Sequence, residues 1–98
     1  METTYTHTTW HVRPGREEEF VDRWREWVDW SGHEGFAAQA LLLRDLESPQ
    51  KFVSFGPWES AAAVRNWRTL PGYAERVARL SEVVESFEPR TLEIAARR

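Results

Sequence analysis

Residues 51–67, KFVSFGPWESAAAVRNW, hold the signals from which the fold of this chain can be predicted. The run at 52–55 is short and rich in β-branched and aromatic residues, which is typical of a buried strand, and a Gly-Pro pair then interrupts it. Ser60 can cap a helix after this break, because its hydroxyl accepts a hydrogen bond from a backbone N–H that the first turn leaves unpaired. Trp58 and Trp67 bracket the resulting strand-turn-helix corner. Because so short a helix is marginal in water, we expect tertiary packing to hold it.

The remaining segments predict three further strands and two further helices. Residues 16–30 show the clearest periodicity, with apolar side chains at i, i+4, i+7 and i+8 from Phe20, which indicates an amphipathic helix. Residues 36–44 are ambiguous, because Ala and Leu favour a helix whereas a glycine before them and a turn after them favour a strand; we interpret them as a strand. Pro89 indicates that the last strand lies at a sheet edge or carries a bulge. The expected strands are 4–12, 36–44, 51–56 and 87–95, and the expected helices are 16–30, 60–68 and 73–85.

This β-α-β-β-α-α-β order predicts an α+β fold of the ferredoxin-like type. With right-handed crossovers, such an order forms a four-stranded antiparallel sheet with its helices on one face. The first strand carries bulky side chains on both of its faces, and no segment remains to cover the second face. One set is Tyr5, His7, Thr9 and His11, and the other is Thr6, Thr8, Trp10 and Val12. We therefore predict a single domain over residues 1–98 that pairs with a second copy as a homodimer.

The composition of the chain excludes several classes of function. The 98 residues carry a formal net charge of −3 without a basic stripe, so nucleic acid is not an expected partner. The lack of cysteine excludes disulfides and thiolate chemistry and fits a cytoplasmic location. Neither a secretory leader nor an apolar run of the ~20 residues that a membrane span needs is evident. Six tryptophans are more than one small core usually needs, which indicates a ligand cavity or an interface.

Residues along nearly the whole chain carry a resemblance to a known family. They are Pro14-Gly15, Glu19-Phe20, Gly35-Phe36, the runs at 41–44 and 52–55, Trp58-Glu59-Ser60, Trp67 and Pro71-Gly72-Tyr73. In this pattern and in its element order, the sequence resembles the antibiotic biosynthesis monooxygenase (ABM) domain family. The resemblance implies a dimeric α/β barrel. It leaves the activity open, because the family includes cofactor-free quinone-forming oxygenases and haem-degrading enzymes.

The two branches of this family imply different site residues. The haem-degrading pattern has an asparagine on the first strand, a tryptophan on the second helix and, about ten residues later, a histidine that ligates iron. Trp67 matches the tryptophan, but the other positions fall near Thr8 and at Val77, and valine cannot ligate iron. We therefore expect no haem cleavage. The cofactor-free branch is similar at Trp58, while its other polar positions fall at Ser54, Val64 and near Ala78.

His7 and His11 are the candidate general bases, since an unperturbed imidazole titrates near neutral pH. The alternative is that they are hydrogen-bonded strand residues at the rim or at the dimer contact. Four residues apart on a strand, they are separated by roughly 13 Å, which is too far for both to bind one metal ion. His33 lies in an expected loop beside Glu34, and we expect no metal site.

Trp58, Trp67 and Tyr73 are the candidate substrate-binding residues, because they flank breaks in the chain and carry N–H or O–H donors on flat rings. Ordinary packing is the alternative for each of them. Arg44 ends an apolar strand, and it is a candidate counter-charge for a phenolate or an ordinary strand-end arginine. Trp30 lies at the margin of the apolar stripe of its helix, where either a substrate or the core can be its neighbour.

The leading functional hypothesis is a cofactor-independent monooxygenase that oxidises an aromatic, polyketide-like phenol or anthrone with O2. The resemblance to the ABM family supplies most of this hypothesis. An electron-rich substrate that loses a proton in a dry aromatic pocket can donate an electron to O2, so no cofactor is expected. Two alternatives stay open: a polyketide cyclase or isomerase that uses the same base without oxygen, and a dimeric ligand-binding domain without turnover.

Overall fold

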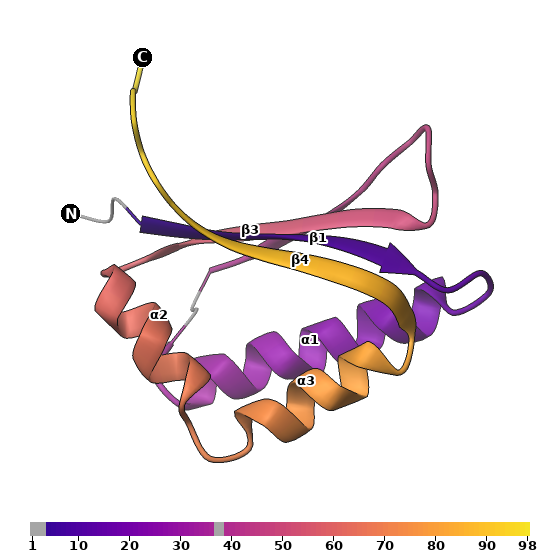
Figure 1. Cartoon of the computed structure of the whole chain (residues 1–98), viewed down its shortest axis with the longest axis horizontal. Coiled ribbons are helices and arrows are strands. Elements are labelled where there is room, and N and C mark those ends of the chain that lie inside the picture. Colours follow the sequence, from indigo (N-terminus) through magenta and orange to yellow (C-terminus); the bar gives the residue numbers. More distant parts are fainter. Residues whose placement is uncertain (1–3, 37–38) are drawn as a thin grey trace.

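The computed structural model describes residues 4–36 and 39–98, in which a four-stranded antiparallel sheet is covered on one face by three helices (Figure 1). The elements follow the predicted β-α-β-β-α-α-β order, which confirms the ferredoxin-like fold. Their bounds are β1 Thr4–Val12, α1 Glu17–His33, β2 Leu41–Arg44, β3 Lys51–Trp58, α2 Ala61–Arg68, α3 Tyr73–Ser81 and β4 Val84–Glu93.

The order of strands in the sheet is β2-β3-β1-β4, so β1 lies in the centre and β4 at an edge. β1 pairs antiparallel with both neighbours, and Thr8 lies opposite Ser54 of β3 and opposite Pro89 of β4. A proline has no N–H to donate to a neighbouring strand, which an edge position tolerates. The edge position predicted for the last strand is confirmed.

The first helix is longer than the sequence pattern predicts. α1 continues beyond residue 30 through Ser31 to His33. Ser31 is buried, and its hydroxyl donates a hydrogen bond to the carbonyl of Trp27 at 2.9 Å, one turn earlier in the helix. The glycine at position 32, which suggests a helix end, is therefore tolerated inside the last turn, because Ser31 is anchored in the core.

Boundaries of three strands also differ from the expectation. β3 extends to Trp58 instead of ending at residue 56, because its pairing with β1 continues through Gly56 and Pro57. β2 begins at Leu41 instead of residue 36, since its pairing with β3 covers only residues 41–44; residues 37 and 38 of the expected strand lie outside the described residues. β4 begins at Val84, which lies opposite Val12, so the expected third helix is shorter by its last turn. Burial of Val83 and Val84 in the core accounts for this early return to the sheet.

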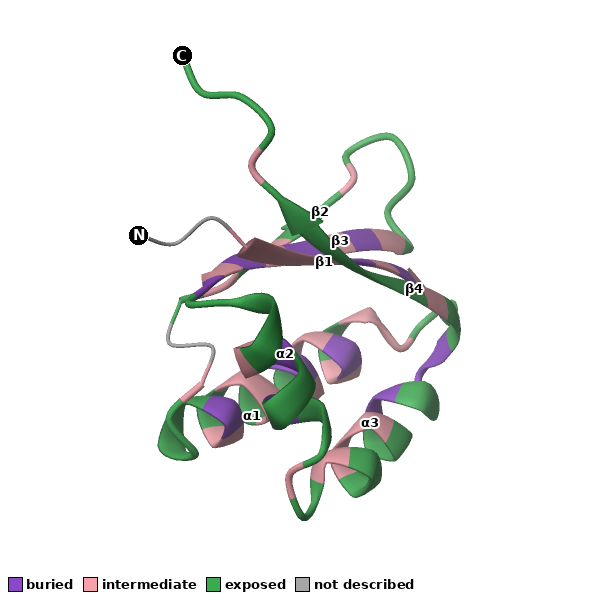
Figure 2. Cartoon of the chain, turned by 60° about the vertical axis from the view of Figure 1, so that its left-hand side comes forward, coloured by how far each residue is buried: buried purple, intermediate pink, exposed green. Residues whose placement is uncertain are grey.

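Alternation along the strands directs one set of side chains toward the helices. These buried residues are Thr8, Trp10 and Val12 on β1, and Phe52, Ser54 and Trp58 on β3. Trp10 lies in the larger of two clusters, with its ring 5.2 Å from those of Phe20 on α1 and Phe87 on β4. Trp58 forms the second cluster with Val64 and Trp67 of α2. The buried residues lie between the sheet and the helices (Figure 2).

The opposite face of the sheet has no helix over it (Figure 2). We call it the helix-free face; by strand alternation and register it carries Tyr5, His7, Thr9, His11, Leu41, Leu43, Val53, Phe55, Arg90 and Leu92. Leu41, Leu43 and Leu92 are 57%, 46% and 46% exposed. The side chains expected to lack a cover within one chain do lack it.

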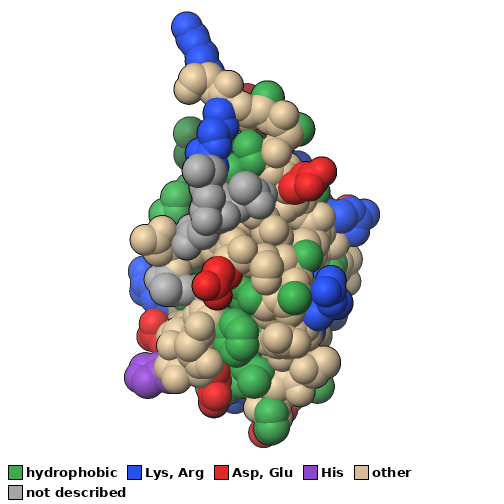
Figure 3. Space-filling model, turned by 90° about the vertical axis from the view of Figure 1, so that its left-hand side faces the viewer, with side chains coloured by type: hydrophobic (Ala, Val, Ile, Leu, Met, Phe, Trp, Pro, Cys, Tyr) green, Lys and Arg blue, Asp and Glu red, His purple; other side chains and the backbone are tan. Residues whose placement is uncertain are grey.

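The end of the molecule at which α2 lies has no large area of one charge sign (Figure 3). Acidic, basic and apolar side chains are interspersed over this surface. Such a mixture does not provide the basic footprint that nucleic-acid binding needs.

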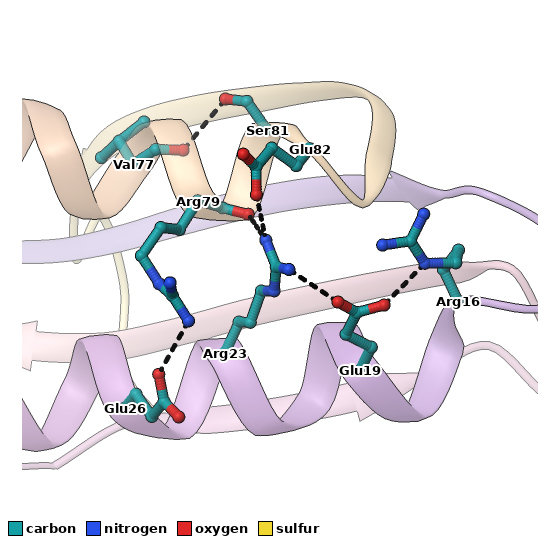
Figure 4. Close-up of polar contacts among 8 residues, drawn as sticks. All are labelled: Arg16, Glu19, Arg23, Glu26, Val77, Arg79, Ser81 and Glu82. Carbon is teal, nitrogen blue, oxygen red and sulfur yellow. Dashed lines mark hydrogen bonds and ion pairs between the residues drawn. The ribbon is translucent and has the colours of Figure 1, made fainter.

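An ion-pair network fixes α1 against α3 (Figure 4). The guanidinium of Arg23, whose side chain is only 16% exposed, donates to Glu19 at 2.6 Å, to Glu82 at 2.5 Å and to the carbonyl of Arg79 at 2.5 Å. Arg16 donates to the second oxygen of Glu19 at 2.6 Å. These hydrogen bonds, that from Arg16 above all, hold the pKa of the Glu19 carboxyl below its usual range. The network therefore stays charged at neutral pH and sets the position of α3.

Gly56 on β3 occupies a position that admits no side chain. A Cβ atom there would overlap the carbonyl oxygen of Gln39 and would lie 3.2 Å from the Cα of Ala40, and backbone atoms cannot rotate aside. We predict that Gly56→Ala lowers the free energy of unfolding by about 1–3 kcal/mol, as overpacking does. Chemical denaturation measures this change.

Gly32→Ala is the matched control. A Cβ at Gly32 meets nothing within 4 Å, and the residue lies in α1, so this change is expected to raise the free energy of unfolding by about 0.4–1 kcal/mol. Equal unfolding midpoints for Gly56→Ala and the parent chain would contradict the close approach of the 39–40 backbone to β3.

Candidate functional site

A cavity of about 70 Å³ lies between the sheet and the helices. Side chains from β1, α1, β3, α2, α3 and β4 line it, so it lies between the two core clusters. The exposed lining residues Gln39, Arg68 and Pro89 mark where it reaches the surface. A dry cavity of about 150 Å³ holds one benzene. The cavity as it stands therefore has room for dioxygen or a few waters, and a polycyclic ligand enters only when its mouth widens.

Aromatic rings form one wall of the cavity. The ring of Trp67 lies 4.9 Å from that of Trp58, 4.9 Å from that of Tyr73 and 5.1 Å from that of Trp27. Trp67 therefore links α1, β3, α2 and α3 at one point. These separations are typical of interacting aromatic pairs, and the group offers flat apolar surfaces to a planar ligand.

Three buried indoles are held in place by hydroxyl groups. Each pair joins segments that are distant in the sequence, and each satisfies an N–H that would otherwise be unpaired in the core. Trp10 donates to Ser54 at 2.9 Å, Trp58 to Thr6 at 2.8 Å and Trp67 to Ser31 at 2.8 Å. All six residues line the cavity, so the bonds that hold its wall together are also part of its surface.

The sheet side of the cavity is rich in hydrogen-bond donors. The hydroxyls of Thr6 and Ser54 each accept from an indole, which leaves their own O–H protons free to donate. Thr8 lies opposite Ser54 and lines the cavity, and its hydroxyl finds no partner among the described residues. The indole nitrogens of Trp24 and Trp27 are also buried without a partner. An unsatisfied buried donor costs about 1–3 kcal/mol, so the two unpaired indole N–H groups are a functional signal.

Tyr73 and Arg68 are the ionisable residues that line the cavity. Burial raises the pKa of the Tyr73 phenol, and the positive charge of the Arg68 guanidinium opposes that rise in part. Tyr73 is therefore protonated at neutral pH, and its hydroxyl can donate a hydrogen bond to a ligand instead of acting as a base. No carboxylate or imidazole is among the lining residues in the described part of the chain.

The structure brings together three of the residues selected from the sequence. Trp58, Trp67 and Tyr73 share one wall of the cavity, as described above. His7 and His11 do not line it, because they alternate with Thr8 and Trp10 along β1 and therefore lie on the helix-free face. A role for either histidine as a base stays a prediction, and it would need a site on that opposite face.

Arg44 and Trp30 also lie away from the cavity. The Arg44 guanidinium donates to the carbonyl of Pro49 at 2.7 Å and lies over the ring of Phe52 at 5.3 Å, at the outer edge of the sheet. Trp30 packs against the second cluster, and the Arg76 guanidinium lies 5.0 Å from its ring. Neither residue is within the set that lines the cavity.

Sequence reasoning missed several lining residues. Trp24 and Trp27 belong to the apolar stripe of the first helix, for which the sequence favours core packing over a place in a pocket, and Ser31 lies just beyond the expected helix 16–30. The spacing of these three residues at i, i+3 and i+7 is a helical stripe that continues into the last turn, and this signal could have identified Ser31. Thr6 and Thr8 share a face with Trp10, which could have identified them as cavity residues.

Two further kinds of site find no support in the described part of the chain. Over residues 4–36 and 39–98, no three His, Asp or Glu side chains gather as a metal site would require. The helices within these ranges are also too short or too polar to cross a lipid bilayer.

A family model described as antibiotic biosynthesis monooxygenase matches residues 4–79. No curated protein matches the sequence. Among solved structures, SnoaB of Streptomyces nogalater, a cofactor-independent oxygenase solved as its N63A mutant, superposes with a TM-score of 0.87 at 17% identity, over 99% of this chain and 97% of its own.

Two other structures show the same fold. A conserved protein from Methanosarcina mazei superposes with a TM-score of 0.81 at 17% identity, over 95% of this chain and 93% of its own. A protein from Pseudomonas aeruginosa superposes with a TM-score of 0.77 at 18% identity, over 98% of this chain and 97% of its own. At these identities the structural likeness establishes the fold alone.

Ser31 provides a test of how the cavity wall is held. Its hydroxyl is the acceptor for the buried Trp67 N–H, so Ser31→Ala leaves that donor unpaired. We predict a loss of about 1–3 kcal/mol in the free energy of unfolding, measured by chemical denaturation.

Ser81→Ala is the matched control, because the Ser81 hydroxyl also donates to a carbonyl one turn earlier, that of Val77, but accepts no buried indole. This exposed change is expected to stay within about 0.5 kcal/mol of the parent. Similar losses for the two variants would show that the Trp67 bond contributes nothing.

Proposed function

We propose, from the premise that the chain belongs to the antibiotic biosynthesis monooxygenase family, that it is a cofactor-independent monooxygenase for an electron-rich aromatic phenol or anthrone. The single observation that carries the proposal is a cavity that combines an aromatic wall with free hydrogen-bond donors. The description of SnoaB as a cofactor-independent oxygenase supports the reaction class.

The proposed reaction needs only the substrate and O2. An anthrone that has lost a proton is a phenolate-stabilised carbanion, and it transfers one electron to O2. The resulting substrate radical and superoxide combine to a peroxide at the former methylene carbon. The peroxide anion takes up one proton, which replaces the one lost at the start, and loss of water then leaves a carbonyl. The balance is a CH2 group plus O2 giving C=O plus H2O. The substrate supplies all of the electrons, and no external reductant enters.

The cavity residues act on the charge that develops in this sequence. Trp58 and Trp67 stack on the planar ring system and exclude water, which strengthens electrostatic interactions inside the cavity. The protonated Tyr73 donates to the oxyanion, and the Arg68 guanidinium beside it adds positive charge at the mouth. These groups lower the free energy of the deprotonated substrate relative to its neutral form. The substrate can therefore lose its proton to water at the mouth of the cavity, without a protein base.

A ligand-binding domain without turnover is the second candidate. The lack of a carboxylate or imidazole among the described lining residues and the volume of about 70 Å³ favour it, because both fit a site that retains a ligand without proton transfer. A cyclase or isomerase on the same scaffold needs a base, which makes it the weaker alternative.

Oxygen uptake with dithranol, a model anthrone, tests the proposed activity. The parent protein is expected to accelerate uptake above the uncatalysed rate, and Tyr73→Phe to lower kcat/KM by about 10²-fold, as loss of an oxyanion donor does. Tyr5→Phe is the control, since Tyr5 lies outside the cavity on the helix-free face and should keep the parent rate. Saturable binding of dithranol without any acceleration would instead support the ligand-binding domain.

The helix-free face supports a second proposal, that two copies of the chain associate through it as a homodimer. Its leucines are half-exposed, and partly buried aromatic residues lie between them, so apolar surface is present that one chain does not cover. A dimer would also cover His7 and His11.

The lack of cysteine in the whole sequence supports a reducing compartment such as the cytoplasm for this protein.

Mass measurement in dilute solution tests the homodimer. The parent chain is expected at twice the mass of one chain, and Leu43→Glu, which places a charge on the helix-free face, is expected at the mass of one. Leu46→Glu is the control, because Leu46 is 95% exposed in the loop between β2 and β3 and should stay dimeric. A parent chain that is a stable monomer at micromolar concentration would overturn this proposal.

A further inference from the structure

Two buried hydrogen-bond donors on α1 have no acceptor. The indole nitrogens of Trp24 and Trp27 are shielded from water, and neither donates a hydrogen bond within the described residues. Trp24 is 8% exposed, and both residues line the cavity. In contrast, Trp10, Trp58 and Trp67 each donate to a hydroxyl. The two unpaired donors are thus an exception within one cavity, and the large majority of buried polar groups in proteins have partners.

Trp24 and Trp27 lie on the same face of α1, and both line the cavity. Residues three apart on an α-helix are neighbours on one face, about 4.5 Å apart along the axis. The ring of Trp27 meets the ring of Trp10 edge to face, at 6.0 Å and 84°. An aromatic ring is at most a weak acceptor for an N–H, so this ring contact does not replace an oxygen acceptor for the Trp27 indole.

We propose that Trp24 and Trp27 form a subsite that binds an acceptor oxygen of the ligand, either a carbonyl or a phenolate oxygen. The ligand class, though not the existence of the subsite, rests on the proposed function. Free hydroxyl donors of Thr6, Thr8 and Ser54 lie on the sheet side of the same cavity, so the cavity offers donors from two sides. Water would bring two further donors into this space, whereas a quinone or phenolate oxygen only accepts. The ligand's carbonyl or phenolate oxygen reaches the two indole N–H groups when the ligand's aromatic ring system enters the cavity and widens it.

The subsite predicts which ligands the cavity prefers. A planar aromatic that carries carbonyl oxygens should bind more tightly than a hydrocarbon of the same shape, because only the former pairs with the indole donors. Anthraquinone sulfonate and the anthracene sulfonate with its sulfonate at the same ring position are such a matched pair. Neither is oxidised by O2 under these conditions, so the comparison needs no turnover.

Nitrogen-15 NMR of the full chain tests the proposal, because each of the six tryptophans gives one indole N–H signal. The signals are assigned with Trp24→Phe and Trp27→Phe, and the spread of the remaining signals shows that each variant is folded. Anthraquinone sulfonate is expected to move the Trp24 and Trp27 signals downfield, as a new hydrogen bond does, and anthracene sulfonate is not. Each variant should weaken binding of the quinone by about tenfold and leave binding of the hydrocarbon unchanged.

Trp30→Phe is the control variant, because Trp30 lies on the same helix with its ring outside the cavity. It should bind both probes as the parent does. The proposal is overturned if the quinone moves other cavity indoles but not those of Trp24 and Trp27, if the two probes bind equally, or if neither probe binds. Downfield shifts of the Trp24 and Trp27 signals without oxygen uptake from dithranol would support the subsite and reject the oxygenase. Oxygen uptake without these shifts would support the oxygenase and reject the subsite.

Discussion

A buried indole N–H costs free energy unless an acceptor meets it, and the acceptors that meet three of the tryptophans organise the space between the sheet and the helices. Trp67 illustrates it: its N–H on α2 needs the hydroxyl of Ser31 on α1, which in turn is anchored to the Trp27 carbonyl. The short α2, which has little stability of its own, is thereby held against the longest helix. The same requirement aligns Trp10 and Trp58 with hydroxyls on neighbouring strands.

These pairings also determine the electrostatic character of the cavity. The hydroxyls of Thr6 and Ser54, which accept from indoles, keep a proton to donate, and Tyr73 adds a phenol whose raised pKa keeps it protonated. The cavity therefore favours acceptor oxygens and anionic charge without holding a carboxylate or imidazole among its described lining residues. In the proposed reaction, such a site acts by stabilising the charge that develops on the substrate.

The two faces of the sheet carry different sets of side chains. The face toward the helices carries the tryptophans and hydroxyls of the cavity, and the helix-free face carries leucines, aromatic residues and both β1 histidines. A shift of one residue in the register of β1 would exchange these sets, because successive side chains point to opposite faces. The long pairing of β1 with both neighbouring strands makes that shift costly. The ion pairs of Arg23 hold α3, which contributes to the cavity lining, against α1.

The sequence by itself determined the element order, the antiparallel sheet with helices on one face, and the family, because periodicity and turn residues are local signals that survive in one dimension. It also indicated Trp58, Trp67 and Tyr73, which flank breaks in the chain. Only the tertiary structure decided which face of β1 meets the helices, and with it that Thr6 and Thr8 line the cavity while His7 and His11 do not. Strand alternation separates two sets of residues but does not say which set is covered. The roles of Ser31, Trp24 and Trp27 were likewise hidden, since an unpaired donor becomes visible only when every neighbour in space is known.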